Sequence, residues 1–355
     1  MKTILVTGSS GLVGSATARK FHQLGYQIVG LDNDMRSFYF GDASSTKQTR
    51  EVLIQELSNY MHVDADIRDQ QTLEQIFSEY GQYLKAVVHC AAQPSHDWAA
   101  RDPHLDFEVN AVGTLNLLEL TRRFAKEASF IFMSTNKVYG DSPNRIPLEE
   151  GELRWNPINM HTRDFGIDES MSIDASTHSL FGVSKTSADL LVQEYGRYFG
   201  MNTVSFRGGC LTGPSHAGAE LHGFLSYLVK CTVGSKPYRI FGYLGKQVRD
   251  NIHSEDLVEA FVRYVESPLP ARVYNIGGGQ FSNVSVLEAI ELIEAISGRK
   301  LKWSLDSEHR VGDHKWYVSD ISRFMQDYPG WGITRNIPSI LEEMVRIEIE
   351  TDAES

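Results

Sequence analysis

Three glycines near the start of the chain have the spacing of a phosphate-binding turn. The segment TGSSGLVG places Gly8, Gly11 and Gly14 directly after an apolar run and ahead of a helix-like segment. Glycine permits the tight turn and lets the backbone approach a pyrophosphate closely, while the N-terminus of the next helix attracts the anion. The residues expected to contact the pyrophosphate of a dinucleotide cofactor are Gly8, Ser10, Gly11, Leu12 and Val13.

The acidic residue that such a site needs follows in the next strand-like segment. The run QIVGLD ends in Asp32, whose carboxylate can bond both hydroxyls of the adenosine ribose, and Asn33 lies beside it. Because this carboxylate would repel a 2′-phosphate, we predict NAD as the cofactor rather than NADP. Arg36 is a nearby cation that could weaken this preference.

Later segments supply more residues for the same crevice. Small side chains at a strand end let a cofactor lie close to the backbone, and an acidic residue after another strand can meet the adenine edge. Asn110 lies in a helix-like segment that is otherwise apolar on one face, which is typical of a buried amide that satisfies backbone groups. The residues expected to line this part of the crevice are Asp66, Ile67, Ala91, Ala92, Gln93 and Asn110.

These motifs lie on alternating strand-like and helix-like segments. Apolar, β-rich runs are typical of parallel strands that are buried on both faces. The expected strands are 4–8, 27–32, 85–92, 129–135 and 202–209, and the expected helices are 12–24, 70–80, 106–126 and 183–199. Strands that alternate with helices predict an α/β fold, a Rossmann-type doubly wound parallel sheet.

The second half of the chain has shorter and more mixed elements. Strand-like runs occur at 238–241 and 273–276, and helix-like segments at 220–231, 255–265, 285–296 and 337–347. We therefore expect a dinucleotide-binding domain over 1–210, with strands returning from the C-terminal half, and an interwoven, smaller mixed α/β lobe over 211–355. The acidic tail, ETDAES, is expected to fray.

Bulk composition excludes several classes of partner. The chain has 355 residues and a formal net charge of −12, with no basic run, so no nucleic-acid or anionic-membrane surface is expected. No stretch approaches the roughly 20 apolar residues of a membrane helix, and the N-terminus does not resemble a signal peptide. Three cysteines without paired metal spacing predict no metal site and a reducing, cytoplasmic setting.

Several motifs in order resemble one enzyme family over nearly the whole chain. They are STNKVYGD at 134–141, the FxxxK pair at Phe181 and Lys185, GKQVRDNIHSEDL at 245–257 and YNIGGG at 274–279. Together with the glycine turn they resemble the extended short-chain dehydrogenases/reductases of the nucleotide-sugar epimerase and dehydratase class. Within that class the motifs, with GIDES at 166–170, are most similar to those of the CDP-paratose 2-epimerase subfamily.

This resemblance implies a reaction and a partner. Such enzymes hold NAD, remove hydride from a sugar carbon and return it after the keto intermediate has changed, with no net consumption of cofactor. The subfamily implies a CDP-sugar substrate, a CDP-deoxyhexose that is inverted at C2. It also implies a homodimer formed through the helices that match 106–126 and 183–199.

The resemblance also assigns the catalytic stretch, with one departure. Thr135 matches the residue that hydrogen-bonds the reacting oxygen, Ser134 precedes it on the cofactor side, and Lys185 matches the lysine that reaches the nicotinamide ribose. The family tyrosine, whose phenol acts as general base, is replaced here by Phe181. Phenylalanine carries no proton.

Three explanations for Phe181 remain open at the level of sequence. In the first, the proton passes to a neighbour, for which His178, Tyr139 and Lys137 are candidates, and of these only histidine titrates near neutrality when unperturbed. In the second, Phe181 is an introduced substitution that traps a substrate. The third explanation is a protein that binds NAD and a sugar nucleotide without turnover.

The two residues after Thr135 exclude a related reaction. The 4,6-dehydratases carry an Asp-Glu pair there, the acid and base that eliminate water, whereas this chain has Asn136 and Lys137. A dehydratase of that kind is therefore not expected. We expect Asn136 to hold a sugar hydroxyl and Lys137 either to stabilise an enolate or to be a solvated lysine.

Binding a nucleoside diphosphate to an acidic protein requires fixed cations. By resemblance, Arg249 and Arg310 match the two arginines that reach the pyrophosphate, and a guanidinium fork suits a phosphate. Loop residues after the expected strand 85–92 and at the start of the smaller lobe complete the expected set of substrate contacts. The expected substrate contacts are Ser95, His96, Thr135, Asn136, Cys210, Glu220, His222, Gln247, Arg249 and Arg310.

Overall fold

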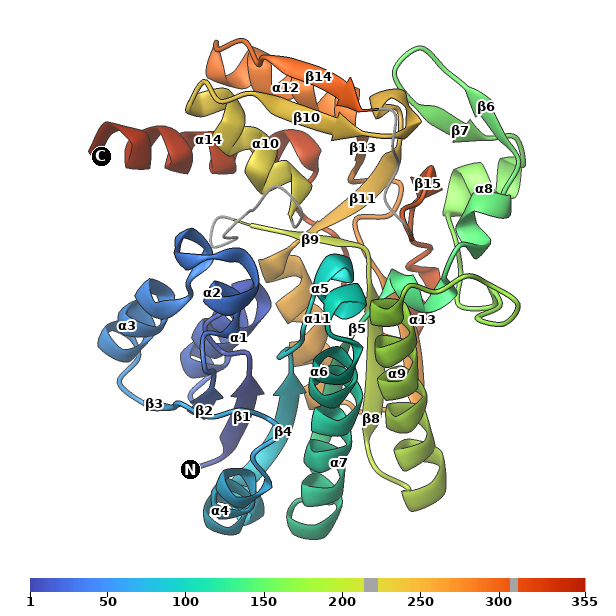
Figure 1. Cartoon of the computed structure of the whole chain (residues 1–355). Coiled ribbons are helices and arrows are strands. Elements are labelled where there is room, and N and C mark those ends of the chain that lie inside the picture. Colours follow the sequence, from blue (N-terminus) through green and yellow to red (C-terminus); the bar gives the residue numbers. More distant parts are fainter. Residues whose placement is uncertain (214–222, 307–311, 355) are drawn as a thin grey trace. The chain divides into compact units, whose positions relative to one another are not determined.

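The computed structural model describes residues 1–213, 223–306 and 312–354 (Figure 1). The chain divides into two compact units. Unit 1 contains residues 1–138, 179–207 and 257–274, and unit 2 contains 139–178, 208–256 and 275–355. The division differs from the expected one at residue 210 because 139–178 leave the sheet for unit 2, while 257–274 return to unit 1.

A seven-stranded sheet forms the centre of unit 1. Its order is β12-β8-β5-β4-β1-β2-β3, and β1 pairs in parallel with β2 and β4, β2 with β3, and β4 with β5. The crossover order and the parallel pairing confirm the predicted α/β, Rossmann-type fold. The strands are β1 (Thr3–Thr7), β2 (Gln27–Leu31), β3 (Tyr60–Val63), β4 (Leu84–His89), β5 (Ser129–Thr135), β8 (Thr203–Gly208) and β12 (Arg272–Ile276).

Helices connect these strands and cover the sheet. All five residues of β1 are buried, as a strand covered on both faces requires. One core packs Val87 and Phe130 of the sheet against Leu117, Leu118 and Val192 of two helices. The helices are α1 (Leu12–Gln23), α2 (Met35–Phe40), α3 (Lys47–Glu56), α4 (Gln70–Tyr80), α5 (His96–Arg101), α6 (Pro103–Phe107), α7 (Gly113–Phe124), α9 (Leu180–Phe199) and α11 (Ser254–Glu266).

Two features of these helices differ from the expected ranges. The expected helix 106–126 is split, because a π-helical segment, η3 (Glu108–Val112), separates α6 from α7. The long helix α9 begins at the cap residue Ser179, whose side chain accepts a hydrogen bond from the Gly182 amide, and ends at Gly200 in the left-handed conformation.

Unit 2 is built around a second core. Helices α10, α12 and α14 pack on one another and on β10, burying Leu228, Ile240, Ile293 and Leu341. The elements of unit 2 are β6 (Leu148–Glu150), β7 (Trp155–Pro157), α8 (Met160–Phe165), β9 (Cys210–Thr212), α10 (Phe224–Val233), β10 (Tyr238–Phe241), β11 (Val248–His253), β13 (Asn283–Ser285), α12 (Val286–Ser297), β14 (Trp303–Asp306), β15 (Trp316–Tyr317), α13 (Ser322–Asp327) and α14 (Ile337–Glu354).

The tail differs from the expectation of a frayed end. Helix α14 continues through Glu354, because its apolar face, with Ile340, Leu341 and Val345, is buried against α10 and α12 and supports further helical turns. Short 3-10 turns complete the chain: η1 (Asp42–Ser44), η2 (Gly81–Tyr83), η4 (Asn136–Tyr139), η5 (Ser142–Arg145) and η6 (Tyr243–Gly245). Within the described ranges, no helix is both long enough and apolar enough to cross a membrane.

Candidate functional site

The glycine turn after β1 is closed by backbone contacts. Gly8 has a φ of +66°, and a Cβ atom there would lie 2.8 Å from the amide nitrogen of Ala91. A Cβ atom at Gly14 would overlap the carbonyl of Gly8. The Gly11 amide donates to the Gly8 carbonyl at 3.1 Å, and Gly11 is the N-cap of α1. Gly8 and Gly14 therefore require glycine for steric reasons.

Asp32 is fixed beside this turn. One carboxylate oxygen accepts the backbone N–H of Ser10 at 2.9 Å, and the other accepts the N–H of Asp34 at 2.9 Å. Burial raises the pKa of Asp32, although these two backbone donors oppose the rise. Because each carboxylate oxygen can accept more than one hydrogen bond, the group can also accept from ribose hydroxyls.

Asp66 and Ile67 lie in the loop that follows β3. Burial alone would raise the pKa of Asp66, but hydrogen bonds from Arg68 and Asn33 outweigh it, and the pKa is lowered. The Asp66 carboxylate is therefore charged and held in place. Ile67 is buried against Gly113 at the start of α7, and its carbonyl accepts from Asn116 at 3.2 Å.

The loop after β4 is held by a buried amide network. Ala91 and Ala92 are half-buried at its start, and the Ala91 amide lies 3.3 Å from Thr7 Oγ1. Gln93 is buried, and its amide N–H donates to Asn110 Oδ1 at 3.0 Å. Asn110 Nδ2 lies 3.0 Å from the Gln93 carbonyl and 3.1 Å from Ser184 Oγ. The Asn110 amide, in the π-helical segment, thus joins this loop to α9.

Phe181 and Lys185 lie four residues apart on α9 and share a face of the helix. Both are nearly inaccessible to solvent, with exposed fractions of 7% and 3%. Lys185 Nζ donates to the Met133 carbonyl at 2.8 Å and lies 4.2 Å from the ring centre of Phe132. Burial lowers the pKa of Lys185 to about 8.

Thr135 and Ser134 end β5 and have different surroundings. Thr135 is half-buried, and its Oγ1 accepts the Lys137 amide at 3.2 Å. Ser134 Oγ instead donates to Asp189 Oδ2 at 2.6 Å, and Asp189 forms a buried ion pair with Arg207 at 2.8 Å. The Ser134 hydroxyl therefore faces a buried structural network, while Thr135 is only half-buried.

The three candidate proton acceptors, Tyr139, His178 and Lys137, and the neighbouring Asn136 differ in their contacts. Tyr139 is fully buried and donates its phenol proton to Asn275 Oδ1 at 2.7 Å, which is a packing arrangement. His178 Nδ1 lies 3.1 Å from the Ser176 carbonyl in its own loop. Lys137 is half-buried and Asn136 is buried, with its Oδ1 3.5 Å from Thr135 Oγ1.

His96 lies against the residue that replaces the family tyrosine. Its ring and that of Phe181 pack edge to face, with centroids 5.0 Å apart. His96 Nδ1 is 2.7 Å from Ser179 Oγ, and Ser95 caps the short helix α5 that His96 begins. The structure thus brings together an imidazole, a hydroxyl and the phenylalanine ring, all within unit 1.

The expected diphosphate residues belong to unit 2. Arg249 on β11 is largely buried; its Nη2 donates to Asp313 Oδ1 at 2.5 Å and its Nη1 to the Val248 carbonyl at 2.7 Å. Gln247 is buried and donates to the Phe241 carbonyl at 3.2 Å. Cys210 is half-buried on β9, beside Asn251 in the parallel register of β9 with β11. Glu220, His222 and Arg310 lie outside the described residues.

Three residues of these networks were missed by the sequence analysis. Ser179 could have been found, because a serine three residues before Gly182 at a helix start is an N-cap signal. Tyr60, whose phenol lies 3.0 Å from Ser9 Oγ at the glycine turn, and Asp313, which pairs with Arg249, gave no local signal. Both contacts join residues that are far apart in the chain.

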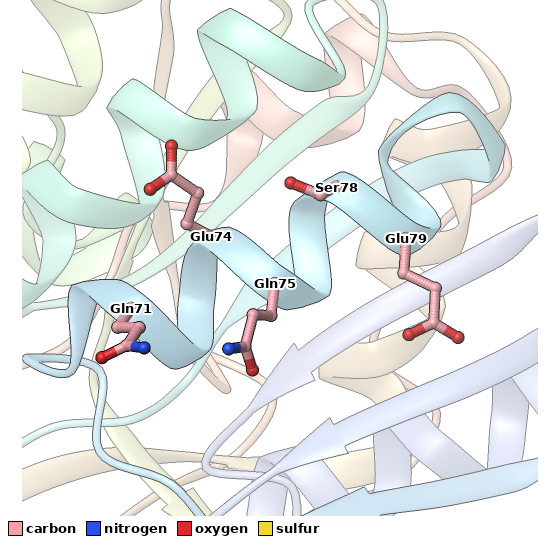
Figure 2. Close-up of a pocket in the computed structure, with 5 residues that line it drawn as sticks. All are labelled: Gln71, Glu74, Gln75, Ser78 and Glu79. Carbon is pink, nitrogen blue, oxygen red and sulfur yellow. The ribbon is translucent and has the colours of Figure 1, made fainter.

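A surface hollow elsewhere has no comparable chemistry. Figure 2 shows the five polar residues that line it, Gln71, Glu74, Gln75, Ser78 and Glu79, all on helix α4. Glu74 pairs with Arg123 at 3.0 Å on the surface.

Among the described residues, no three His, Cys, Asp or Glu side chains lie close enough to hold a metal ion.

Comparison with known proteins decides the family. The model of the family described as "NAD dependent epimerase/dehydratase family" matches residues 4–277. The chain belongs to this family. CDP-paratose 2-epimerase of Salmonella typhi is 30% identical, with 90% of this chain and 91% of that protein covered. UDP-glucose 4-epimerase of Neisseria meningitidis serogroup A is also 30% identical, with 98% and 97% covered.

Solved structures of the family have the same fold. UDP-glucuronic acid 4-epimerase from Bacillus cereus, in complex with UDP-glucuronic acid and NAD, has a TM-score of 0.80 at 24% identity, with 98% of this chain and 99% of that chain covered. UDP-glucose 4-epimerase from Thermus thermophilus, in complex with NAD, has a TM-score of 0.77 at 24% identity, with 98% of each chain covered.

The residues present fit the NAD that this family uses, as predicted. The fixed carboxylate of Asp32 suits ribose hydroxyls, and at Gly8 and Gly14 the main chain of the turn packs too closely on other main chain for any side chain to intervene. Gly8, Ser10, Gly11, Leu12 and Val13 would hold the pyrophosphate, and Lys185 would reach the second ribose. NAD, when bound, supplies an acceptor and donor of hydride.

Proposed function

We propose that the chain is an NAD-dependent nucleotide-sugar epimerase that acts through a keto-sugar intermediate. One observation carries the proposal. The Asp32 and glycine cradle, Thr135 at the end of β5 in the same sheet, and the buried Lys185 on α9 all belong to unit 1. These groups hold a dinucleotide and orient a sugar hydroxyl, which is what reversible hydride transfer requires.

The finer proposal is inversion at C2 of a CDP-deoxyhexose. Its support is the motif set of the sequence, with Asn136 and Lys137 after Thr135, and the similarity to CDP-paratose 2-epimerase. UDP-sugar epimerases have the same identity to this chain, so the nucleotide base is the part of the proposal that most needs a measurement. In unit 2, the largely buried Arg249 is the residue proposed to bind the diphosphate.

Each protein group has a proposed task. Thr135 Oγ1 holds the reacting hydroxyl, Asn136 holds a second sugar hydroxyl, and Lys185 orients the nicotinamide ribose. Phe181 contributes only packing, so the proton of the reacting hydroxyl must pass to another group. If no group accepts this proton, the chain is instead a protein that binds NAD and a sugar nucleotide without turnover. The phenylalanine at position 181 favours this second candidate.

The test is incubation of the NAD-loaded protein with CDP-paratose, CDP-tyvelose, UDP-glucose and UDP-glucuronic acid in deuterated water. Inversion at C2 of a CDP-sugar without solvent deuterium supports return of the same hydride. Deuterium at the carbon beside the ketone would indicate enolisation and a different mechanism. Binding of a sugar nucleotide without any conversion would establish the silent protein.

We also propose a homodimer and a cytoplasmic setting. Helix α9 exposes Val183, Leu190 and Tyr198, while α6 exposes Phe107 and the π-helical segment after it exposes Val112. Such apolar side chains on neighbouring helices are suited to pairing with a second copy. Sedimentation of the wild-type chain and of Leu190→Lys tests this, because a charge in the interface should produce monomers.

A further inference from the structure

The reaction proposed above leaves one proton without an acceptor. When a C–H bond yields hydride, the hydroxyl on the same carbon must lose its proton for the ketone to form. A phenol at position 181 would take it, but the ring there is phenylalanine. Tyr139 is committed to Asn275 at 2.7 Å and is fully buried. The acceptor must come from a group close to Phe181.

His96 is such a group. It belongs to the loop after β4, yet its ring packs on Phe181 of α9, with centroids 5.0 Å apart and ring planes at 62°. The side chain is half-buried, so it is partly accessible. Histidine is also the side chain whose ordinary pKa lies closest to neutral pH. An imidazole therefore lies beside the site of the absent phenol.

The loop fixes the position of this histidine from both sides. Before it, the Ser95 amide donates to Gln93 Oε1 at 2.5 Å, and Gln93 Nε2 donates to Asp106 Oδ1 at 2.7 Å. After it, the Trp98 indole N–H donates to the Tyr39 carbonyl at 2.6 Å. Held backbone on each side of His96 gives its ring a defined location, as a proton acceptor needs.

Ser179 lies within hydrogen-bonding distance of one ring nitrogen of His96. Its Oγ accepts the Gly182 amide at 3.1 Å as the N-cap of α9 and lies 2.7 Å from His96 Nδ1. A hydroxyl oxygen has two lone pairs, so it can accept a second hydrogen bond from Nδ1–H. That tautomer leaves the lone pair on Nε2, which is the atom that must accept the substrate proton.

We propose that His96 is the acid–base residue of this chain and that Ser179 is its positioning residue; the proposal rests on the epimerase function above. The C–H electron pair leaves as hydride to the nicotinamide while the hydroxyl proton moves to His96 Nε2, giving the ketone and an imidazolium. On return, hydride adds to the opposite face of the ketone and Nε2 gives the proton back. Protons and electrons balance over the cycle.

The first test is turnover by three variants of the NAD-loaded protein on CDP-paratose. His96→Gln should lower the rate by roughly 100-fold or more, as expected for loss of a general acid–base group. His104→Gln, an exposed histidine on α6, is the matched control and should leave the rate unchanged. In the His96→Gln background, Phe181→Tyr should restore most of the lost rate, which a merely structural role of His96 would not predict.

The second test determines which ring nitrogen of His96 carries the proton, and it needs no substrate. Nitrogen NMR of the NAD-loaded protein should find neutral His96 protonated at Nδ1, and Ser179→Ala should shift the population toward the Nε2 tautomer. Ser179→Thr, which keeps the hydroxyl, should retain the wild-type tautomer. The Ser179→Ala change should also lower turnover by about tenfold or more.

The outcomes separate the two proposals. Full turnover in His96→Gln, or an imidazole protonated at Nε2 in the wild-type chain, overturns the role of His96 and leaves the epimerase function intact. Failure of the wild-type chain and of Phe181→Tyr to convert any of the four sugar nucleotides overturns the function itself, and the role of His96 with it.

Discussion

The cofactor cradle and the first turns of α9 lie in the same unit but are built in different ways. In the cradle, ligand-facing positions are defined by the backbone: glycines fit where a Cβ atom would overlap a carbonyl, and Asp32 is held by two amide N–H groups. In α9, the positions of Phe181 and Lys185 are defined by side-chain contacts with His96, Phe132 and the Met133 carbonyl.

The two regions should therefore differ in how they tolerate a substitution. A substitution in the glycine turn collides with main chain that cannot move without unfolding the strand end. A substitution at position 181 exchanges one aromatic ring for another of nearly the same shape and removes only a hydroxyl. The chemistry of a side-chain site can therefore change while the binding site stays constant.

The strongest test of this contrast is Gly14→Ala. The added methyl group would overlap the Gly8 carbonyl, so we expect a loss of about 3 kcal/mol in the free energy of unfolding and no measurable NAD binding. Gly332→Ala is the matched control, because a Cβ atom there meets nothing within 4 Å among the described atoms. Urea unfolding and calorimetric titration with NAD measure both effects. Normal NAD affinity in Gly14→Ala would contradict the backbone argument.

The next largest effect is the dependence of stability on pH that the buried Lys185 causes. Its pKa is about 8 in the folded chain and 10.5 in the reference state, so below pH 8 both states hold the proton and the folded chain bears the full cost of burial. Between pH 8 and 10.5 the unfolded chain binds more protons, and stability rises with pH. Between pH 7 and pH 10, the free energy of unfolding of the NAD-free wild type should rise by about 2 kcal/mol relative to that of Lys185→Met. Urea unfolding at each pH measures this change. A constant difference would show that Lys185 is not desolvated.

A smaller effect is expected at the ribose end of the cradle. Asp32→Asn removes the charge that repels a 2′-phosphate, so the ratio of NADP to NAD affinity should rise roughly tenfold, about 1.4 kcal/mol. Fluorescence titration with both reduced cofactors gives this ratio. Asp69→Asn, which changes only the N-cap of α4, serves as the control and should leave the ratio unaltered. An unchanged ratio in Asp32→Asn would argue against contact with the ribose.

The smallest effect is expected for Tyr60→Phe. The phenol lies 3.0 Å from Ser9 Oγ and 3.3 Å from His62 Nδ1, and its loss removes both contacts while the ring continues to pack against Gly30. We expect a change of about 1 kcal/mol in the free energy of unfolding and less than about threefold in NAD affinity. Thermal and urea unfolding measure the change in stability, and NAD titration measures the change in affinity. A loss as large as that of Gly14→Ala would mean that side chains, and not the backbone, hold the cradle.

Much of the fold was determined locally and could be predicted. Buried strands such as β1 and β5 have apolar runs that end within a few residues of their observed ends, and the glycine spacing with Asp32 identified the cofactor. Elements with weak periodicity, such as β3 and the hairpin β6–β7, were missed, because their residues are only partly buried and tertiary pairing stabilises them.

The sequence by itself determined the alternation of strands and helices, the family and the absence of a phenol at position 181, because each of these depends on residue types at short spacing. Only the tertiary structure decided that Ser134 turns to a buried ion pair, that Tyr139 is committed to Asn275, and that His96 lies on Phe181. These contacts join residues of different elements that are far apart in the chain, and a linear pattern contains no record of which elements the fold brings together.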